Sequence, residues 1–405
     1  MEDTALAKLR RIAVVTTSRA DYSHLFWVLR KLQAHPRVDL RLLVGGAHCA
    51  PGFGLSQEEI VRDGFEIEAH IESLLDSDSD VGMAKTIGVA TLGLADTLGR
   101  LGPDLLLLIA DRYEMLAPAC VATALRIPMA HIEGGEVSEG AIDDAIRNAL
   151  TKLCHLHFVS TSQARRRVLA MGEEAWRVTH AGAPSLDHLS ASKLLSRKEL
   201  EKALNLDLSR PPQIIAFHPV TLSSDSDAEV LALFDALRQL TGPFIFCFPN
   251  ADTGHQLIIN HAKALCGEGS GNHLFINLGP IHYWSLLKCA DLMIGNSSSG
   301  IMETPSLALP CVNVGIRQQG RERAKNIIDV PANPKAIVEG VKQATDAKFR
   351  EQLVGMTNPY GDGRASERIV QKLTETPLDG RLRQKTALQM TDLASTGLDA
   401  FIQDT

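Results

Sequence analysis

Carboxylate side chains directly follow two apolar runs in the first half of the chain. Asp111 comes after the run LLLLIA, Glu133 comes after MAHI, and the acidic pair Asp143 and Asp144 follows shortly afterwards. Carboxylates are costly to bury, and they rarely end two buried strands unless they are paired or used. Neighbouring carboxyl groups also push their pKa values apart, so that one acts as an acid while another acts as a base. These residues therefore predict a site for proton transfer.

An ion-pair network is the alternative interpretation of these carboxylates. Arg112, Arg126 and Arg147 lie close to them in the sequence and could neutralise them. The acidic residues of this region outnumber the three arginines, which favours chemistry over pairing alone. The double glycine Gly134-Gly135 also turns the chain sharply and leaves room for a ligand against the backbone.

A serine-rich stretch in the second half has the character of a phosphate site. The residues NSSSG, from Asn296 to Gly300, follow an apolar run and open a helical pattern. Backbone N–H groups, hydroxyls and the positive end of a helix dipole bind phosphate at such a junction without a metal. Ser297 and Ser298 are the candidate ligands, and an ordinary serine N-cap is the alternative. Glu303 could hold a ribose diol or merely complement the helix dipole.

A second junction of this kind lies near the N-terminus, in the stretch TTSRADYS. Arg19 could bind a pyrophosphate with two parallel hydrogen bonds, and a solvated pair with Asp21 is the alternative. His218 ends the first apolar run of the second half. A lone histidine more often has a structural role, and the position at a strand end makes a functional role a stronger alternative. Asn250 and Asp252 offer donors and an acceptor to a sugar or base, although such a cluster is more often a turn.

The elements that must position these residues alternate between strands and helices. An apolar stripe along residues 23–33 predicts a helix, and alternation of this kind predicts an α/β fold with parallel sheets. Two Rossmann-like halves would then face each other across a cleft at the carboxyl ends of their strands. The expected buried strands are Ile12–Thr16, Leu40–Val44, Leu105–Ile109, Met129–Ile132, Leu156–Val159, Ile214–Phe217, Phe244–Phe248, Leu274–Leu278, Leu292–Ile294 and Cys311–Val314.

The domain organisation follows from a change of character in the middle of the chain. Residues 1–190 are expected to form the first domain and residues 213–360 the second, because 405 residues exceed one hydrophobic core. A charged stretch and a double proline place a linker or hinge at residues 191–212. We expect a helix within residues 361–380 to pack back on the first domain, and a weakly attached tail over residues 381–405.

Composition excludes several classes of protein. The net charge of −7 argues against a nucleic-acid binder, and no apolar run is long enough to span a membrane. The seven dispersed cysteines resemble reduced thiols, and the N-terminus is too polar for a signal peptide. These features predict a cytoplasmic protein. Neither G-x-G-x-x-G nor G-x-x-x-x-G-K-[ST] is present, so we expect no bound cofactor and no metal.

Eight motifs in order resemble the UDP-N-acetylglucosamine 2-epimerase family: SRADY, ADRYE, HIEGGEVSEGAIDDAIRNALTK, FHP, PNADTG, GNSSSGIMETPSL, GIRQQGRERAKNIIDV and NPYGDGRAS. The HIEGGEVSEG segment is more similar to the hydrolysing branch than to the non-hydrolysing one. The resemblance implies the two-domain fold known as GT-B, and a homodimer or homotetramer. It also implies the reaction: the C2 proton is removed, UDP leaves to give a 2-acetamidoglucal, and water adds to yield N-acetylmannosamine.

The resemblance assigns roles to individual residues. The catalytic positions are Asp111, Glu133, Asp143 or Asp144, and His218. The positions that hold the UDP-sugar are Arg19, Ala20, Ser23, Arg112, His218, Asn250, Asp252, His282, Ser297, Ser298, Glu303 and Arg317. Which carboxylate is the base and which is the acid does not follow from the sequence.

The chain departs from the family pattern at two positions, and four alternative functions are to be weighed. The family usually has glycine where this chain has Ala110, and the hydrolysing branch commonly has histidine where it has Asn148. The first alternative substrate is UDP-N,N′-diacetylbacillosamine, as on a legionaminic acid route. A non-hydrolysing epimerase or a GT-B glycosyltransferase ranks below it, and a non-catalytic nucleotide-sugar sensor is disfavoured by the cleft carboxylates.

Overall fold

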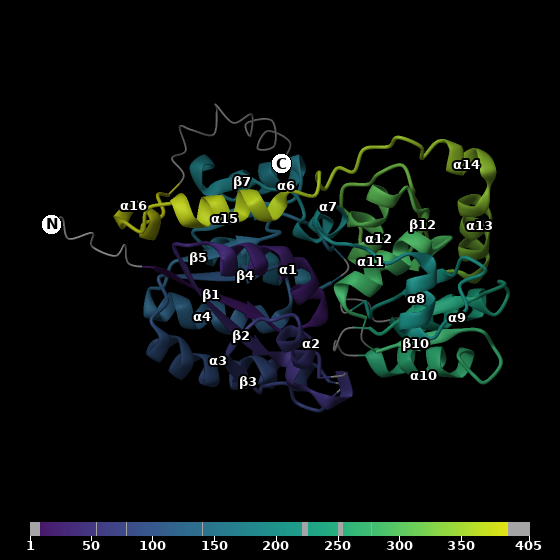
Figure 1. Ribbon diagram of the computed structural model, residues 1–405, viewed down its shortest axis with the longest axis horizontal. Coiled ribbons are helices and arrows are strands. Elements are labelled where there is room, and N and C mark those ends of the chain that lie inside the picture. Colours follow the sequence, from purple (N-terminus) through teal and green to yellow (C-terminus); the bar gives the residue numbers. More distant parts are fainter. Residues whose placement is uncertain are drawn as a thin grey trace, which may run out of the picture.

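In the computed structural model, the described part of the chain comprises residues 9–53, 55–77, 79–139, 141–220, 226–249, 254–276 and 278–387. Its strands form two sheets in which every pairing is parallel (Figure 1). The first has the order β3-β2-β1-β4-β5-β6-β7 and the second the order β10-β9-β8-β11-β12-β13. Two parallel sheets with helices around them confirm the predicted α/β fold.

The first sheet lies in the N-terminal half of the chain. Its strands are β1 (Arg10–Thr16), β2 (Val38–Gly45), β3 (Ile67–Ile71), β4 (Leu105–Ile109), β5 (Met129–Ile132), β6 (Leu156–Val159) and β7 (Val178–His180). Its helices are α1 (Arg19–Ala34), α2 (Gln57–Arg62), α3 (Asp80–Leu101), α4 (Leu116–Leu125), α5 (Asp143–Leu153), α6 (Ser162–Ala170) and α7 (Asp187–Ala191).

The second sheet lies in the C-terminal half. Its strands are β8 (Gln213–Ala216), β9 (Phe244–Cys247), β10 (His273–Phe275), β11 (Leu292–Gly295), β12 (Cys311–Val314) and β13 (Ile327–Val330). The remaining helices are α8 (Arg197–Leu204), α9 (Ser226–Leu237), α10 (His255–Leu265), α11 (Pro280–Cys289), α12 (Ser298–Met302), α13 (Pro334–Thr345), α14 (Ala347–Glu351), α15 (Ala365–Glu375) and α16 (Gly380–Arg383).

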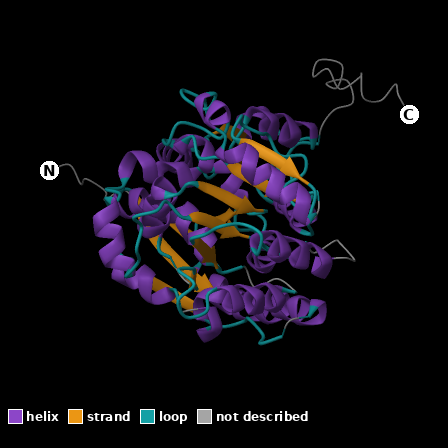
Figure 2. Ribbon diagram, turned by 90° about the vertical axis from the view of Figure 1, so that its right-hand side faces the viewer, coloured by secondary structure: helices purple, strands orange, loops and turns teal. Residues whose placement is uncertain are grey.

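Burial explains why the predicted strands form. All five residues of β4 are fully buried, because helices surround the strands on both faces of the sheet (Figure 2). All ten predicted strands are present, with bounds that differ by a few residues at most. Strands β3, β7 and β13 were not predicted from the sequence; they lie at sheet edges and mix more exposed with buried residues. An edge strand needs no continuous apolar run, so its sequence lacks the signal that identified the others.

The chain passes between the two halves twice, and the two crossings are tied together. The first lies between α7 and α8, within residues 191–212, and Leu200 of α8 is buried against the second sheet's core. The second leads into α15, which lies over the N-terminal half and packs against α1 (Figure 1). The carboxylate of Asp187 accepts hydrogen bonds from the backbone N–H groups of Ala365 and Ser366, at 2.8 and 2.7 Å. Asp187, at the start of the helix that precedes the first crossing, therefore caps the helix that follows the second.

The beginning of the expected tail is held in place. Arg177 is fully buried and donates hydrogen bonds to the backbone carbonyls of Arg381, Leu382 and Gln384. The chain up to Gln384 is therefore docked on the N-terminal half, and residues 388–405 of the expected tail lie outside the described residues. Within the described ranges, no helix has both the length and the hydropathy that crossing a membrane requires.

Candidate active site

Both sheets reverse their strand order at one point, and the candidate residues gather at these two points. In the first sheet the reversal lies between β1 and β4, and in the second between β8 and β11. Arg19 follows β1, Asp111 follows β4, His218 follows β8 and Ser297 follows β11. Such reversals leave a crevice at the carboxyl ends of the strands, where α/β proteins bind their ligands.

Two connected pockets occupy this crevice. The serine pocket is lined by Ser18, Arg19, Ala20, Ser23, His24, Ala47, Phe53, Ser56, Arg112, Ala216, His218, Cys247, Phe248, Pro249, Phe275, Leu278, Tyr283, Ser297, Ser298, Ser299 and Glu303. The carboxylate pocket is lined by Ala20, Asp21, His24, Ile109, Ala110, Asp111, Arg112, Glu133, Glu136, Ser138, Asp143, Arg147, His218, Ser297, Ser298, Arg317 and Arg321. The two pockets share Ala20, His24, Arg112, His218, Ser297 and Ser298.

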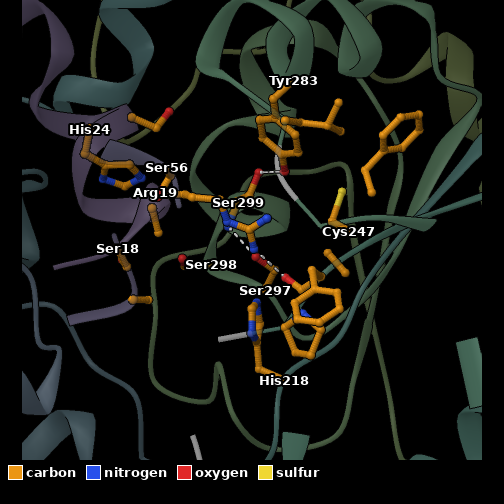
Figure 3. Close-up of a pocket in the computed structure, with 18 of the residues that line it drawn as sticks. Ser18, Arg19, His24, Ser56, His218, Cys247, Tyr283, Ser297, Ser298 and Ser299 are labelled. Carbon is orange, nitrogen blue, oxygen red and sulfur yellow. Dashed lines mark hydrogen bonds between the residues drawn. The ribbon is translucent and has the colours of Figure 1, made fainter. Parts of the chain in front are cut away.

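The serine pocket has a polar end and an apolar end. Figure 3 shows the side chains of Arg19 and His24 and those of the serines lining one space between the two halves. Aromatic and aliphatic groups such as Phe248, Phe275 and Leu278 line the other end. Such a combination suits a ligand with a flat base at one end and an anionic group at the other.

Arg19 crosses the cleft. Its guanidinium donates a hydrogen bond of 3.0 Å to the backbone carbonyl of Phe248 in the second half. Asp21 is instead buried, and it accepts hydrogen bonds from the backbone N–H and the hydroxyl of Thr17, at 3.0 and 2.7 Å. The alternative of a solvated pair between Arg19 and Asp21 is therefore wrong, because Asp21 is used to hold the turn between β1 and α1.

The second half is organised around the side chain of Asn296. Its Oδ1 accepts from the backbone N–H of His218 at 2.7 Å, and its Nδ2 donates to the carbonyl of the same residue at 2.9 Å. The backbone carbonyl of Asn296 in turn accepts from Arg317 and Gln318, at 3.3 and 2.9 Å. One buried amide thus fixes the end of β8, the start of α12 and the loop after β12 against one another. The sequence analysis included Asn296 in its motif but gave it no role of its own.

Hydroxyl groups at α12 form a short chain to Glu303. Ser297 is the N-cap of α12, and its hydroxyl accepts from the backbone N–H of Ser299. The Ser299 hydroxyl contacts both the Tyr283 hydroxyl and the Glu303 carboxylate. Ser297 is therefore a helix N-cap, as the alternative interpretation predicted. Ser297 and Ser298 also line both pockets, so the capping role does not exclude contact with a ligand.

The carboxylate pocket contains three of the four predicted carboxylates. Asp111 pairs directly with the buried Arg147, and Oδ1 of Asp143 lies 3.8 Å from Nη2 of Arg317 in the other half. Asp144 instead accepts hydrogen bonds from the backbone N–H of Ser138 at 3.0 Å, and from Arg147 and the Asn148 amide. The alternative of ion pairing is realised in part, because Arg147 contacts two of the acidic residues.

The two strand-end positions have an unusual backbone. Ala110 has φ 57° and Glu133 has φ 67°, so both residues adopt the left-handed conformation that L side chains disfavour. His131 stabilises the backbone of Ala110, because its Nε2 lies 2.7 Å from the carbonyl oxygen of that residue. Burial lowers the pKa of His131 to about 4, so the imidazole is neutral at physiological pH. A side chain on Gly135 would clash with the backbone oxygen of Ala164 at 2.3 Å, which explains the second glycine of the motif.

Two neighbouring carboxyl groups in this pocket have opposite pKa shifts. Burial raises the pKa of Glu136 to about 7, where nearby Glu133 adds to the effect and Arg321 opposes it. For Glu133, burial works in the same upward direction, but the charge and the hydrogen bond of His24 lower its pKa overall. This arrangement supplies one proton acceptor and one proton donor near neutral pH. From the sequence, Glu136 was one of the acidic residues of its motif without a role of its own, and His24 was not a candidate.

The remaining predicted residues have mixed outcomes. Ala20, Ser23, Arg112 and Arg317 line one or both pockets. His282 lies on α11 beside Tyr283, and it is Tyr283 that lines the serine pocket. Asn250 and Asp252 lie outside the described residues.

Comparisons with known proteins agree with the family resemblance of the sequence motifs. The family model described as UDP-N-acetylglucosamine 2-epimerase matches residues 30–374. A relative from Campylobacter jejuni, named GDP/UDP-N,N′-diacetylbacillosamine 2-epimerase (hydrolyzing), is 38% identical over 80% of this chain and 85% of its own. A UDP-N,N′-diacetylbacillosamine 2-epimerase (hydrolyzing) from Legionella pneumophila is 35% identical over 93% and 99%. The fold is similar to the crystal structure of UDP-GlcNAc 2-epimerase from Neisseria meningitidis bound to UDP-GlcNAc, with TM-score 0.76 and 18% identity over 90% of this chain and 100% of that one.

Proposed function

The chain belongs to the UDP-N-acetylglucosamine 2-epimerase family, and on that basis we propose that it is a hydrolysing 2-epimerase of UDP-N,N′-diacetylbacillosamine. Both relatives described above carry that activity in their names, and one of them aligns over nearly its whole length. The sequence analysis ranked UDP-N-acetylglucosamine first, and these relatives favour its alternative. UDP-N-acetylglucosamine is the second candidate substrate, because the family as a whole carries that name.

The lining of the two pockets supports a proposed place for each part of such a substrate. The base and ribose occupy the serine pocket, with the base against its apolar end and Glu303 near the ribose hydroxyls. The diphosphate lies where the pockets meet, beside Arg112, His218 and the two serines. The sugar enters the carboxylate pocket. Glycosyl transfer would need room for an acceptor but no such set of carboxylates, so the geometry favours epimerisation.

The reaction needs three proton transfers, and the carboxylate pocket can supply them. A base removes the C2 proton while the C1–O bond breaks and UDP departs, which leaves a glycal with a C1–C2 double bond and the acetamido group at C2. Water then adds at C1 and loses a proton, while C2 gains a proton on the opposite face, so that the free sugar is the C2 epimer. Cationic groups and hydroxyls at the junction stabilise the departing diphosphate. Asp111, Glu133 and Asp143 around one space, opening onto the serine pocket, are the observation that carries the proposal.

The test follows sugar protons by NMR in deuterated water, with UDP-N,N′-diacetylbacillosamine and UDP-N-acetylglucosamine in parallel samples. We expect UDP release together with a free C2-inverted sugar that carries deuterium at C2, and faster turnover of the diacetylated substrate. Faster turnover of UDP-N-acetylglucosamine would move the assignment to the second candidate. UDP-sugar epimers without free sugar would place the enzyme in the non-hydrolysing branch, and the absence of turnover with both would refute the proposal. A sample with the GDP-linked sugar checks the preference for the base.

A further inference from the structure

His24 bridges the two halves of the molecule through two carboxylates. It projects from α1 at the boundary of the two pockets (Figure 3). Its Nδ1 lies 2.8 Å from Oε1 of Glu133, at the end of β5. Its Nε2 lies 3.6 Å from Oε1 of Glu303, at the end of α12 in the other half. One imidazole therefore contacts a carboxylate proposed for proton transfer and a carboxylate proposed for the nucleotide.

The surroundings of His24 favour its protonated form. Burial lowers its pKa, but the charges of Glu133, Glu303 and Asp21 and the hydrogen bond to Glu133 outweigh that effect and raise the pKa to about 9. An imidazolium carries an N–H on both nitrogens, so it donates a hydrogen bond to Glu133 while its positive charge also forms an ion pair with Glu303. The other charged or titratable groups around this contact are His188 on α7, Arg112 beside Asp21, Tyr283 beside Glu303, and Arg321, His131 and Glu136 beside Glu133.

We propose that His24 is a positioning residue, which in its protonated form keeps Glu133 ionised and aimed into the carboxylate pocket, and links it to Glu303 across the cleft. The inference rests on the proposed function for the role of Glu133. Without the imidazolium, Glu133 and Glu136 would compete as two buried carboxyl groups, and burial would favour the neutral form of both. Because Glu303 faces the nucleotide side, the same bridge couples occupancy of the serine pocket to the state of Glu133.

The first test reads the charge of His24 without relying on turnover. Histidine NMR of the full chain, labelled at the ring Cε1, follows each imidazole between pH 5 and 10, and His24→Gln assigns the resonance. We expect His24 to titrate at about 9, and its midpoint to fall by at least about one unit in Glu133→Gln and by less in Glu303→Gln. A midpoint near 6.5 that neither variant moves would overturn the proposal, whatever substrate the enzyme takes.

The second test uses the wild type's preferred substrate and two replacements of His24. We expect His24→Gln to lower kcat by about 10–100-fold with little change of KM, and to shift the acid limb of the pH profile upwards by about one unit. His24→Lys, which restores a cation, should recover most of kcat and the original acid limb. His35→Gln, near the far end of α1, is the matched control and should behave as wild type. Equal losses in the Gln and Lys variants with an unmoved acid limb would leave only a structural role and refute the inference.

Discussion

Arg147 holds the carboxylate of Asp111 in a direct ion pair at one side of the carboxylate pocket. The guanidinium is almost fully buried, and it also donates to the backbone carbonyl of Glu136 and to the hydroxyl of Ser138, at 2.9 and 3.0 Å. The arginine is therefore fixed from several sides and fixes Asp111 in turn. The ion pair with Arg147 and a role in proton transfer do not exclude each other, because the pair orients the carboxylate of Asp111 at the wall of the pocket.

Asp111→Asn and Glu133→Gln should each reduce turnover by about 100-fold or more, because each removes a carboxylate that faces the sugar end of the cleft. Neither residue lines the serine pocket, so the affinity for UDP should stay within a few-fold of wild type. Turnover is measured by UDP release and affinity by isothermal titration calorimetry. Near-normal rates in both variants would show that the proton transfers are carried out elsewhere.

Asp143→Asn should cost much more turnover than Asp144→Asn. Asp143 lines the carboxylate pocket, whereas Asp144 caps the backbone N–H of Ser138. Asparagine keeps the acceptor oxygen that this cap needs, so Asp144→Asn should stay within about five-fold of wild type while Asp143→Asn falls by more than about ten-fold. Steady-state rates of the two matched variants decide between them, and the reverse order would exchange their roles.

Ala110→Gly should stabilise the protein. The left-handed conformation costs a non-glycine residue about 1–2 kcal/mol, while the extra freedom of glycine in the unfolded chain costs about 0.5–1 kcal/mol, so a net gain of roughly 0.5–1 kcal/mol is expected. The backbone hydrogen bonds of residue 110 stay available, because they do not use the side chain. Ala130→Gly, in the extended β5, is the control and should lower the melting temperature. A lower melting temperature for both variants in scanning calorimetry would contradict the strain argument.

Glu136→Gln should stabilise the protein in a manner that depends on pH. Burial raises the folded-state pKa of Glu136 to about 7, above the ordinary value of a glutamate, so its favourable contribution is complete below the unfolded-state pKa and is lost as the pH rises towards 7. Glutamine imitates the neutral carboxyl group at every pH. The variant should therefore match wild type near pH 4.5 and exceed its stability by about 1–3 kcal/mol at pH 8.

Melting temperatures of wild type and Glu136→Gln across this pH range provide the measurement. A difference that stays constant from pH 4.5 to 8 would mean that Glu136 has the same pKa in the folded and the unfolded chain. Glu139→Gln, an exposed neighbour in the same loop, serves as the control and should show no trend.

The sequence predicted most of the strands, and most of the site residues that it predicted line one or both pockets. Buried parallel strands are continuous apolar runs, and the residue types that follow such runs reach the cleft wherever the strand order reverses. Asp111, Glu133 and His218 were identifiable in this way. Three edge strands were missed, because their half-exposed residues carry no such pattern.

The rest depended on contacts between distant segments. His24 lies within the predicted helix, and only the approach of Glu133 and Glu303 from two different halves makes it more than a helix residue. Glu136 owes its shifted pKa to burial beside Glu133, which no local spacing reveals. Asn148, where the hydrolysing branch commonly has histidine, donates to Asp144 at 3.2 Å, so its direct effect is on the loop cap.

The cap that Asp187 provides for α15 has a mechanical consequence. Because it joins the two chain crossings to each other, and Ser190 adds a hydrogen bond to the carbonyl of Gly363 at 2.6 Å, the two halves share a single pivot instead of two separate tethers. Any movement of one half against the other would therefore turn about this place. Such a movement would change the separation between Glu133 and Glu303, while the distances within each half stay fixed. The two contacts of His24 would therefore depend on how far the cleft is closed.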